Sequence, residues 1–172
     1  MLTGPLVFDT SPLGRRPGTE RTIETTIDAP AELGLNMFGV PEGSPMALEL
    51  RLECVMDGVL ATGSVSTRVV GECVRCLTDI EEDFDVDFQE LYVYNVESED
   101  DLTLEDEQLD LEPVLRDAVV LALPHNPLCD PDCPGLCPDC GARLADDPDH
   151  THGEAIDPRW AALRQMTDET QE

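Results

Sequence analysis

MALELRLECVMDGVLATGSVSTRVV, residues 46–70, begins with apolar residues at every second position, the pattern of a strand with one buried face. This face consists of Met46, Leu48, Leu50, Leu52 and Cys54. Asp57 and Gly58 then match the two-residue turn of a β-hairpin, because glycine accepts the positive φ of a type I′ turn. A turn at that place would set Cys54 opposite Ala61, Leu52 opposite Gly63, Leu50 opposite Val65 and Met46 opposite Val69. The segment therefore predicts a central antiparallel pair of strands.

Segments on both sides of this hairpin predict the rest of an α+β fold. RTIETTI, residues 21–27, and EDFDVDFQELYVY, residues 82–94, alternate as strands do. Residues 111–123 carry a broad apolar stripe at helical spacing, with Asp110 as a candidate cap and Pro124 as a stop signal. We expect this helix to cover one face of an antiparallel sheet.

The chain length suits one domain with an appended module. We expect three parts. Residues 1–128 form the α+β domain, with the acidic stretch 95–110 as a solvated loop and the helix at 111–123. Residues 129–156 form a cysteine- and histidine-rich zinc module. Residues 157–172 form a short helix or tail, docked through Trp160 and Leu163.

The charge balance is extreme, with a formal net charge of −28 and ten basic residues that are all arginine. A field this negative repels phosphate backbones and favours a basic partner, although it also serves solubility. No apolar run approaches the length of a membrane span, and the first residues lack the pattern of a signal peptide. We expect a soluble cytoplasmic protein without a membrane partner.

Seven cysteines raise the question of chemistry. Cys54 lies on the inward face of a strand, where a thiol behaves as a small apolar group, so we assign it to the core. The remaining six form two clusters: Cys73 and Cys76 between two strands, and Cys129, Cys133, Cys137 and Cys140 after the helix. Disulfides suit an exported protein, and a redox C-x-x-C pair suits a strand-to-helix junction. Neither setting is present, so metal is favoured.

Zinc fits this pattern, since two cysteines two residues apart turn both sulfurs toward one ion. CPDCG, residues 137–141, has the form of a zinc knuckle, and His150 and His152 bring the ligand count to eight. His125 is interpreted as a local hydrogen-bonding residue that is able to replace another ligand. Eight donors make two closed tetrahedral sites, one from Cys73, Cys76, Cys129 and Cys133 and one from Cys137, Cys140, His150 and His152. The alternative partition joins Cys73, Cys76, Cys137 and Cys140.

Closed ligand shells leave no position for an activated water, so the zinc is expected to be structural. The sequence has no H-E-x-x-H, no glycine-rich phosphate loop and no G-x-S-x-G. We therefore expect no enzyme and no small-molecule substrate. The alternatives left open are a zinc-dependent adaptor between proteins, unrelated to ribosomes, and a thiol redox enzyme.

Six stretches resemble the YceD family, also called the large ribosomal RNA subunit accumulation proteins. They are LVFDTSPLGRRPG, GVPEGSP, GECVRCL, FQELYVY, DLEPVLRDAVVLALPHNPLC and CPGLCPDCGARLADDP, which cover most of residues 6–148 in the family's order. The resemblance implies a cytoplasmic, non-enzymatic factor that large-subunit ribosomal RNA needs in order to accumulate. In this family the gene commonly neighbours that of a small large-subunit ribosomal protein, which implies a protein partner.

Direct RNA contact would depend on few cations. Arg15, Arg16, Arg68 and Arg75 are the candidates for contact with RNA or a partner, and Arg68 and Arg75 are expected near the first cysteine pair. We expect weak RNA binding at most. The preferred partner is a basic ribosomal protein or a precursor particle of the large subunit.

Overall fold

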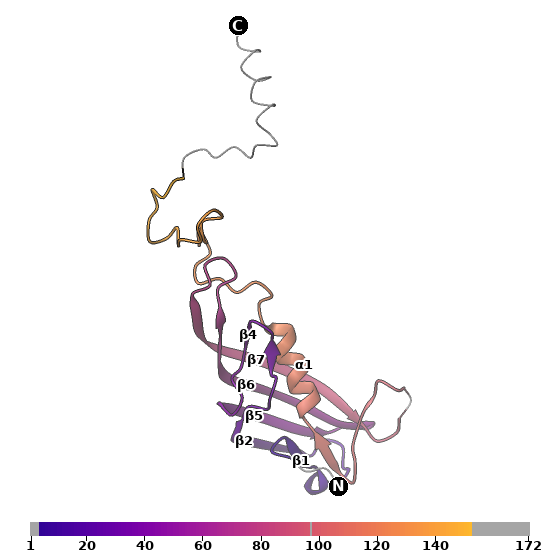
Figure 1. The fold of residues 1–172 in the computed structure, drawn as a ribbon. Helices are drawn as coiled ribbons and strands as arrows, with labels where there is room; N and C mark the ends of the chain where they lie inside the picture. Colours follow the sequence, from indigo (N-terminus) through magenta and orange to yellow (C-terminus); the bar gives the residue numbers. More distant parts are fainter. Residues whose placement is uncertain (1–3, 97, 153–172) are drawn as a thin grey trace. The chain divides into compact units, whose positions relative to one another are not determined.

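The computed structural model describes residues 4–96 and 98–152 (Figure 1). It forms two compact units that divide between Pro131 and Asp132. The first unit holds all the named elements. In chain order they are β1 (Val7–Asp9), the 3-10 helix η1 (Ser11–Leu13), β2 (Glu20–Asp28), β3 (Gly34–Leu35), β4 (Phe38–Gly39), β5 (Pro45–Cys54), β6 (Gly58–Glu72), β7 (Asp79–Val93), β8 (Leu102–Thr103), β9 (Gln108–Asp110) and α1 (Glu112–Ala122).

The main sheet is antiparallel and is built from β2, β5, β6 and β7, each paired with the next. Strands β6 and β7 pair along their whole length, from Gly58 opposite Val93 to Glu72 opposite Asp79. Strand β4 pairs with the end of β6, and β8 adds a short parallel pairing to β7. Figure 1 shows α1 running across β7. The predicted antiparallel sheet with a covering helix is confirmed.

The core lies on the sheet face that the alternating pattern predicted. The five alternate residues of β5 from Met46 to Cys54 are buried, whereas Ala47, Glu49 and Arg51 between them are exposed. Helix α1 adds Val114, Leu115 and Val119 from one side. Complete burial of one such aliphatic side chain contributes roughly 1.5–3 kcal/mol, so this face holds most of the apolar stabilisation. Cys54 belongs to it, and its Sγ lies 3.2 Å from the Tyr94 hydroxyl.

The register of the central hairpin differs from the prediction by two residues. Cys54 pairs with Val59, Leu52 with Ala61, Leu50 with Gly63 and Leu48 with Val65. The turn is centred on Met56 and Asp57, closed by the hydrogen bond from the Val55 N–H to the Gly58 carbonyl at 2.9 Å. Neither turn residue has a positive φ, so the type I′ interpretation was wrong.

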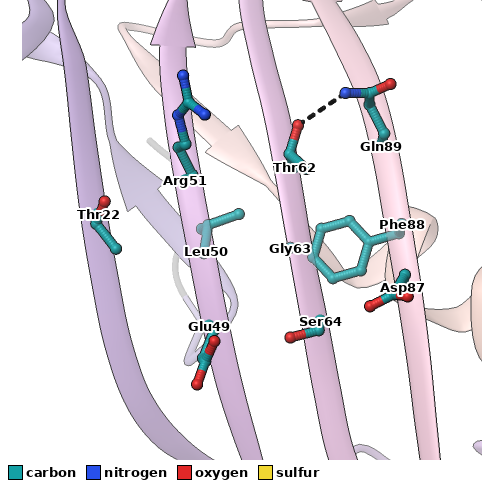
Figure 2. A pocket seen from close by; sticks show the side chains of 10 residues that line it. All are labelled: Thr22, Glu49, Leu50, Arg51, Thr62, Gly63, Ser64, Asp87, Phe88 and Gln89. Atoms are coloured by element: carbon teal, nitrogen blue, oxygen red, sulfur yellow. Dashed lines mark hydrogen bonds between the residues drawn. The ribbon is translucent and has the colours of Figure 1, made fainter.

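Gly58 is needed for another reason: a Cβ there would collide with the Tyr92 carbonyl on β7. Gly63 meets a similar constraint, because its Cβ would lie 2.6 Å from Cζ of Phe88 and 2.5 Å from the Glu49 carbonyl oxygen. Figure 2 shows the Phe88 ring lying beside Gly63. Glycines in β6 thus allow close approach to both neighbouring strands rather than form the turn.

The acidic segment 95–110 was expected to be a solvated loop and is more ordered than that. It contains β8, which pairs with β7 through Leu102 opposite Tyr92, and β9, which pairs with β1. Leu109 at its end is completely buried. These pairings depend on partners distant in sequence, and the local acidic composition does not indicate them.

Helix α1 agrees with the predicted span of 111–123 to within one residue at each end. The Asp110 carboxylate accepts a hydrogen bond from the Glu112 N–H at 3.0 Å, and Leu123 is extended, as a residue before proline prefers. Within residues 4–96 and 98–152, no helix has both the length and the apolar character that crossing a bilayer requires. The predicted C-terminal helix with Trp160 and Leu163 lies outside the described residues.

Candidate metal centres

The first cysteine pair forms the tip of the β6–β7 hairpin. Backbone hydrogen bonds close this turn, from the Cys73 N–H to the Thr78 carbonyl at 2.8 Å and from the Leu77 N–H to the Cys73 carbonyl at 2.9 Å. Leu77, directly after the second cysteine, has a left-handed φ of 57°. The two long paired strands on either side therefore fix both thiols at one end of the sheet.

The second C-x-x-C turn repeats this pattern in the other unit. The Cys137 N–H donates to the Ala142 carbonyl at 2.7 Å, and the Gly141 N–H donates to the Cys137 carbonyl at 2.8 Å. Gly141, again directly after the second cysteine, has a φ of 74°. A bridge between Leu136 and Arg143 flanks the turn. Both pairs thus have the backbone form of a zinc knuckle.

Four sulfurs gather around the first turn. The Sγ atoms of Cys73, Cys76, Cys129 and Cys133 all lie within 4.8 Å of one another. Those of Cys76 and Cys129 are 3.5 Å apart, although 53 residues separate them. With a Zn–S bond of about 2.3 Å, a tetrahedral site places two sulfurs about 3.8 Å apart. The spacing and the all-thiol donor set suit zinc.

The second group combines two thiols with two imidazoles: Cys137, Cys140, His150 and His152. Nε2 of each histidine lies 3.2 Å from the Cys140 Sγ, and the two Nε2 atoms are 2.9 Å apart. Nδ1 of His150 faces the Asp147 carboxylate at 3.6 Å. A carboxylate behind the distal nitrogen of a metal-binding histidine fixes the ring and its tautomer. This group also has the donor set of a closed zinc site.

Backbone N–H groups favour the thiolate form in both groups. The pKa of Cys73 falls to about 6, chiefly through the hydrogen bond from the Cys129 backbone, although desolvation opposes the shift. The pKa of Cys137 also falls to about 6, chiefly through the Asp139 backbone. Because the thiolate is the metal-binding form of cysteine, these N–H groups prepare both clusters for a cation.

All eight sequence-predicted ligands are therefore brought together, in the preferred partition rather than the alternative one. His125 is exposed and lies in neither group. Two supporting residues escaped the sequence analysis. Thr78 places its Oγ1 3.1 Å from the Cys76 Sγ, and Asp147 faces His150. The available signal was their spacing in the sequence: Thr78 lies two residues after Cys76, and Asp147 lies three residues before His150.

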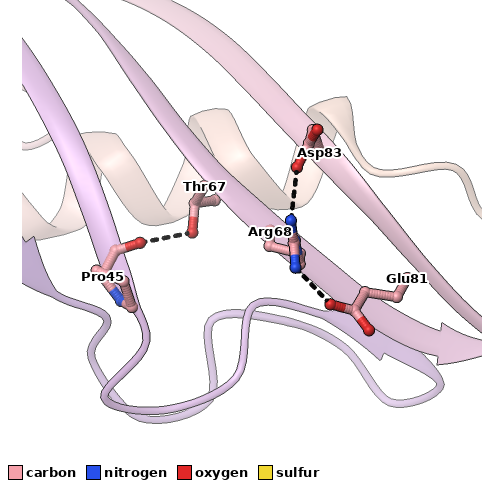
Figure 3. A network of polar contacts seen from close by, with 5 residues as sticks. All are labelled: Pro45, Thr67, Arg68, Glu81 and Asp83. Atoms are coloured by element: carbon pink, nitrogen blue, oxygen red, sulfur yellow. Dashed lines mark hydrogen bonds and ion pairs between the residues drawn. The ribbon is translucent and has the colours of Figure 1, made fainter.

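The candidate arginines do not form a free positive patch. Arg68 pairs with Glu81 at 2.7 Å and Asp83 at 3.4 Å, and these carboxylates raise its pKa (Figure 3). Arg15 lies over the Tyr94 ring and 3.5 Å from a Glu107 carboxylate oxygen. Arg16 and Arg75 are exposed, and Arg75 lies within the first knuckle. The carboxylates paired with Arg68 and Arg15 offset much of the positive charge that binding to RNA would require.

The solvent-facing side of the sheet bears a shallow trough of about 620 Å³ around Gly63. Thr62 and Gln89, hydrogen-bonded at 3.0 Å, lie on one side of it, and Glu49 and Asp87 lie on the other (Figure 2). No cysteine, histidine or tyrosine lines this trough.

Comparison with known proteins identifies the family. The model of the family described as large ribosomal RNA subunit accumulation protein YceD matches residues 61–167. The uncharacterized protein Rv2926c of Mycobacterium tuberculosis is 44% identical over 96% of this chain and 83% of its own length. The uncharacterized protein ML1660 of Mycobacterium leprae is 41% identical over 96% of this chain and 79% of its own.

A more distant relative is the uncharacterized protein YlbN of Bacillus subtilis, a YceD-family protein. It is 23% identical, over 72% of this chain and 74% of its own length. No solved structure matches the chain significantly. The family match extends from β6 through both cysteine groups to the C-terminal segment. The resemblance drawn from the sequence is confirmed: the chain belongs to the YceD family, whose name connects it with the accumulation of large-subunit ribosomal RNA.

Proposed function

We propose that this protein is a cytoplasmic, non-enzymatic factor that promotes the accumulation or processing of large-subunit ribosomal RNA. The observation that carries the proposal is the family match over residues 61–167. This family is not known as a family of enzymes. The two cysteine groups support a structural role for metal, because each offers four donors and so fills a tetrahedral shell without an open position.

Zinc is proposed at both groups. Bound zinc would offset the negative charge of the thiolates, which an acidic chain tolerates poorly. Cys73 and Cys76 would hold the end of the β6–β7 hairpin against Cys129, which follows helix α1. A metal at this place therefore stabilises the fold rather than acts on a substrate, and binding is coupled to folding and to pH.

The proposed partner is a basic ribosomal protein or a precursor particle of the large subunit. The net charge of −28 supports this choice, because it attracts cationic protein segments and repels bare RNA. The carboxylates paired with Arg68 and Arg15 also support it, since a phosphate would have to displace them.

Deletion of the gene tests this function. We expect mature large-subunit ribosomal RNA to fall relative to small-subunit RNA, and wild-type protein to restore the ratio. Cys73→Ser with Cys76→Ser should fail to restore it, whereas the matched control Cys54→Ala, a core thiol outside both groups, should succeed. An unchanged RNA ratio in the deletion strain would reject the ribosomal role and favour a zinc-dependent adaptor unrelated to ribosomes.

The choice of partner is tested separately. Purified protein should bind naked large-subunit RNA weakly at physiological salt, and its affinity should rise steeply as salt is lowered. Tight, sequence-selective binding at physiological salt would overturn the protein partner and leave the ribosomal role intact.

A further inference from the structure

Strand β7 has an open edge along most of its length. On one side it pairs with β6 from Asp79 to Val93. On the other side, within the part of the chain that the structure describes, it pairs only at Tyr92 and Val93, with β8. An unpaired strand edge presents a row of backbone donors and acceptors that another strand is able to use.

A groove of about 640 Å³ lies between this edge and helix α1. Phe88 of β7 and Val114 and Ala118 of α1 give it an apolar lining. Leu91 and Leu121 also line it, and they remain 37% and 80% exposed. These leucines offer apolar surface next to the unpaired backbone.

Every charged residue that lines the groove is acidic: Asp87, Glu90, Asp100, Asp101 and Asp117. The nearest arginine along the helix, Arg116, points elsewhere. Its guanidinium donates to the Glu32 carbonyl at 2.7 Å, to the Ala31 carbonyl at 3.2 Å and to Glu112 at 2.9 Å. The groove therefore combines the unpaired backbone of β7, apolar surface and negative charge.

Charge on an edge strand also prevents strands of neighbouring molecules from pairing. The outward carboxylates of β7, such as Asp83 and Asp85, already meet that need, because they line the exposed face of the same strand. Glu90 and Asp117 lie instead beside the apolar lining of the groove. Protection against aggregation therefore accounts for Asp83 and Asp85. It does not explain why Glu90 and Asp117 lie next to apolar residues in the groove.

We propose that this groove binds an extended basic segment of a partner protein, which adds to the sheet as a strand beside β7. Main-chain hydrogen bonds to the free edge give the affinity, and alternate side chains give the specificity. Cationic side chains on the helix side of the added strand meet Glu90 and Asp117, and the intervening apolar ones pack against Leu91 on the opposite face of the sheet. The inference depends on the proposed function only for the nature of the partner, a basic ribosomal protein.

The test uses the full chain and a short synthetic peptide of alternating arginine and valine. Glu90→Gln with Asp117→Asn should weaken peptide binding about fivefold or more at physiological salt. The matched control, Glu24→Gln with Asp28→Asn, removes the same charge from β2 at the other edge of the sheet and should change binding little. Thermal unfolding of both double variants confirms that they remain folded.

Two further measurements test strand addition itself. Backbone amides between Asp87 and Leu91 should exchange more slowly in the complex, and a peptide N-methylated at alternate residues should lose affinity although its charge is unchanged. Absence of peptide binding, equal weakening by the two double variants, or equal binding of the N-methylated peptide would each overturn the proposal. A normal ribosomal RNA ratio in the deletion strain would instead reject the proposed function and leave peptide binding untouched.

Discussion

Leu77 and Gly141 occupy the same position in two turns with the same backbone hydrogen bonds. Each directly follows the second cysteine of a C-x-x-C pair, and each has a left-handed φ, 57° for Leu77 and 74° for Gly141. Glycine adopts this conformation without cost, whereas other residues lose about 1–2 kcal/mol. Leu77 is 52% exposed. The first knuckle therefore carries backbone strain that the second avoids.

Substitutions at these two positions should change zinc affinity in opposite directions. A Cβ at Gly141 meets no atom within 4 Å, so Gly141→Ala adds backbone strain alone and should weaken zinc binding at the second site about fivefold. Leu77→Gly should relieve strain and strengthen the first site. Chelator competition measures both affinities. The two changes in affinity need not be of equal size. A Gly141→Ala variant with unchanged zinc affinity would show that the left-handed conformation is not needed for binding.

Zinc content follows from the two groups of four donors. Metal analysis of the purified protein should give two ions per chain. His150→Ala with His152→Ala should lower the count to about one, because a closed site does not tolerate the loss of two ligands. Cys54→Ala is the control and should retain both ions. A single ion in the wild-type protein would reject the two-site scheme, and an unchanged count in the histidine variant would remove the histidines from it.

Gly63→Ala should destabilise the fold. The added Cβ would lie 2.5 Å from the Glu49 carbonyl oxygen and 2.6 Å from the Phe88 ring, so a strand or the ring has to move. We expect a loss of about 1–3 kcal/mol in urea unfolding. Phe88→Leu in the same chain should recover part of it. Ser66→Ala, on the exposed face of β6, is the matched control, and an equal effect of both changes would show that the close approach is unimportant.

The phenol of Tyr94 should ionise only at strongly alkaline pH. Burial and the hydrogen bond with Cys54 raise its pKa from the ordinary 10 to about 12. Because the folded pKa lies above the unfolded one, this group contributes its full stability below pH 10 and loses it as the pH rises toward 12. Spectroscopic titration should show a component near pH 12 that disappears in Tyr94→Phe. A Tyr94 component at pH 10 in the folded protein would contradict the buried contact.

The faces of the long strands were predictable because side chains alternate strictly along a strand. Leu50 and Leu52 were assigned to the buried face from their spacing alone, and both are buried. The register was not predictable from the Asp-Gly pair. Gly58 is required by the backbone of β7, which is 34 residues away at Tyr92, and local turn statistics contain no information about that contact.

The short strands were missed for the same physical reason. Residues 108–110 end an acidic stretch that has the composition of a loop, but they pair with residues 7–9, and this pairing is visible only in three dimensions. The two C-x-x-C pairs were easier to recognise because their spacing is local in the sequence. In contrast, the carboxylate partners of Arg68 lie 13 and 15 residues away, on the other strand of the β6–β7 hairpin. The sequence did not determine the register of these two strands, so the ion pairs of Arg68 were not predictable.

The separation of Cys76 from Cys129 has a consequence for synthesis on the ribosome. At about 5–20 residues per second, the 53 residues between them take roughly 3–10 s to be added. During this interval the hairpin tip has two thiols and no partner sulfurs. The second group spans only residues 137–152, so its ligands follow one another within about 1–3 s. Oxidants and competing metal ions therefore have their longest access to Cys73 and Cys76, in the nascent chain rather than in the finished protein.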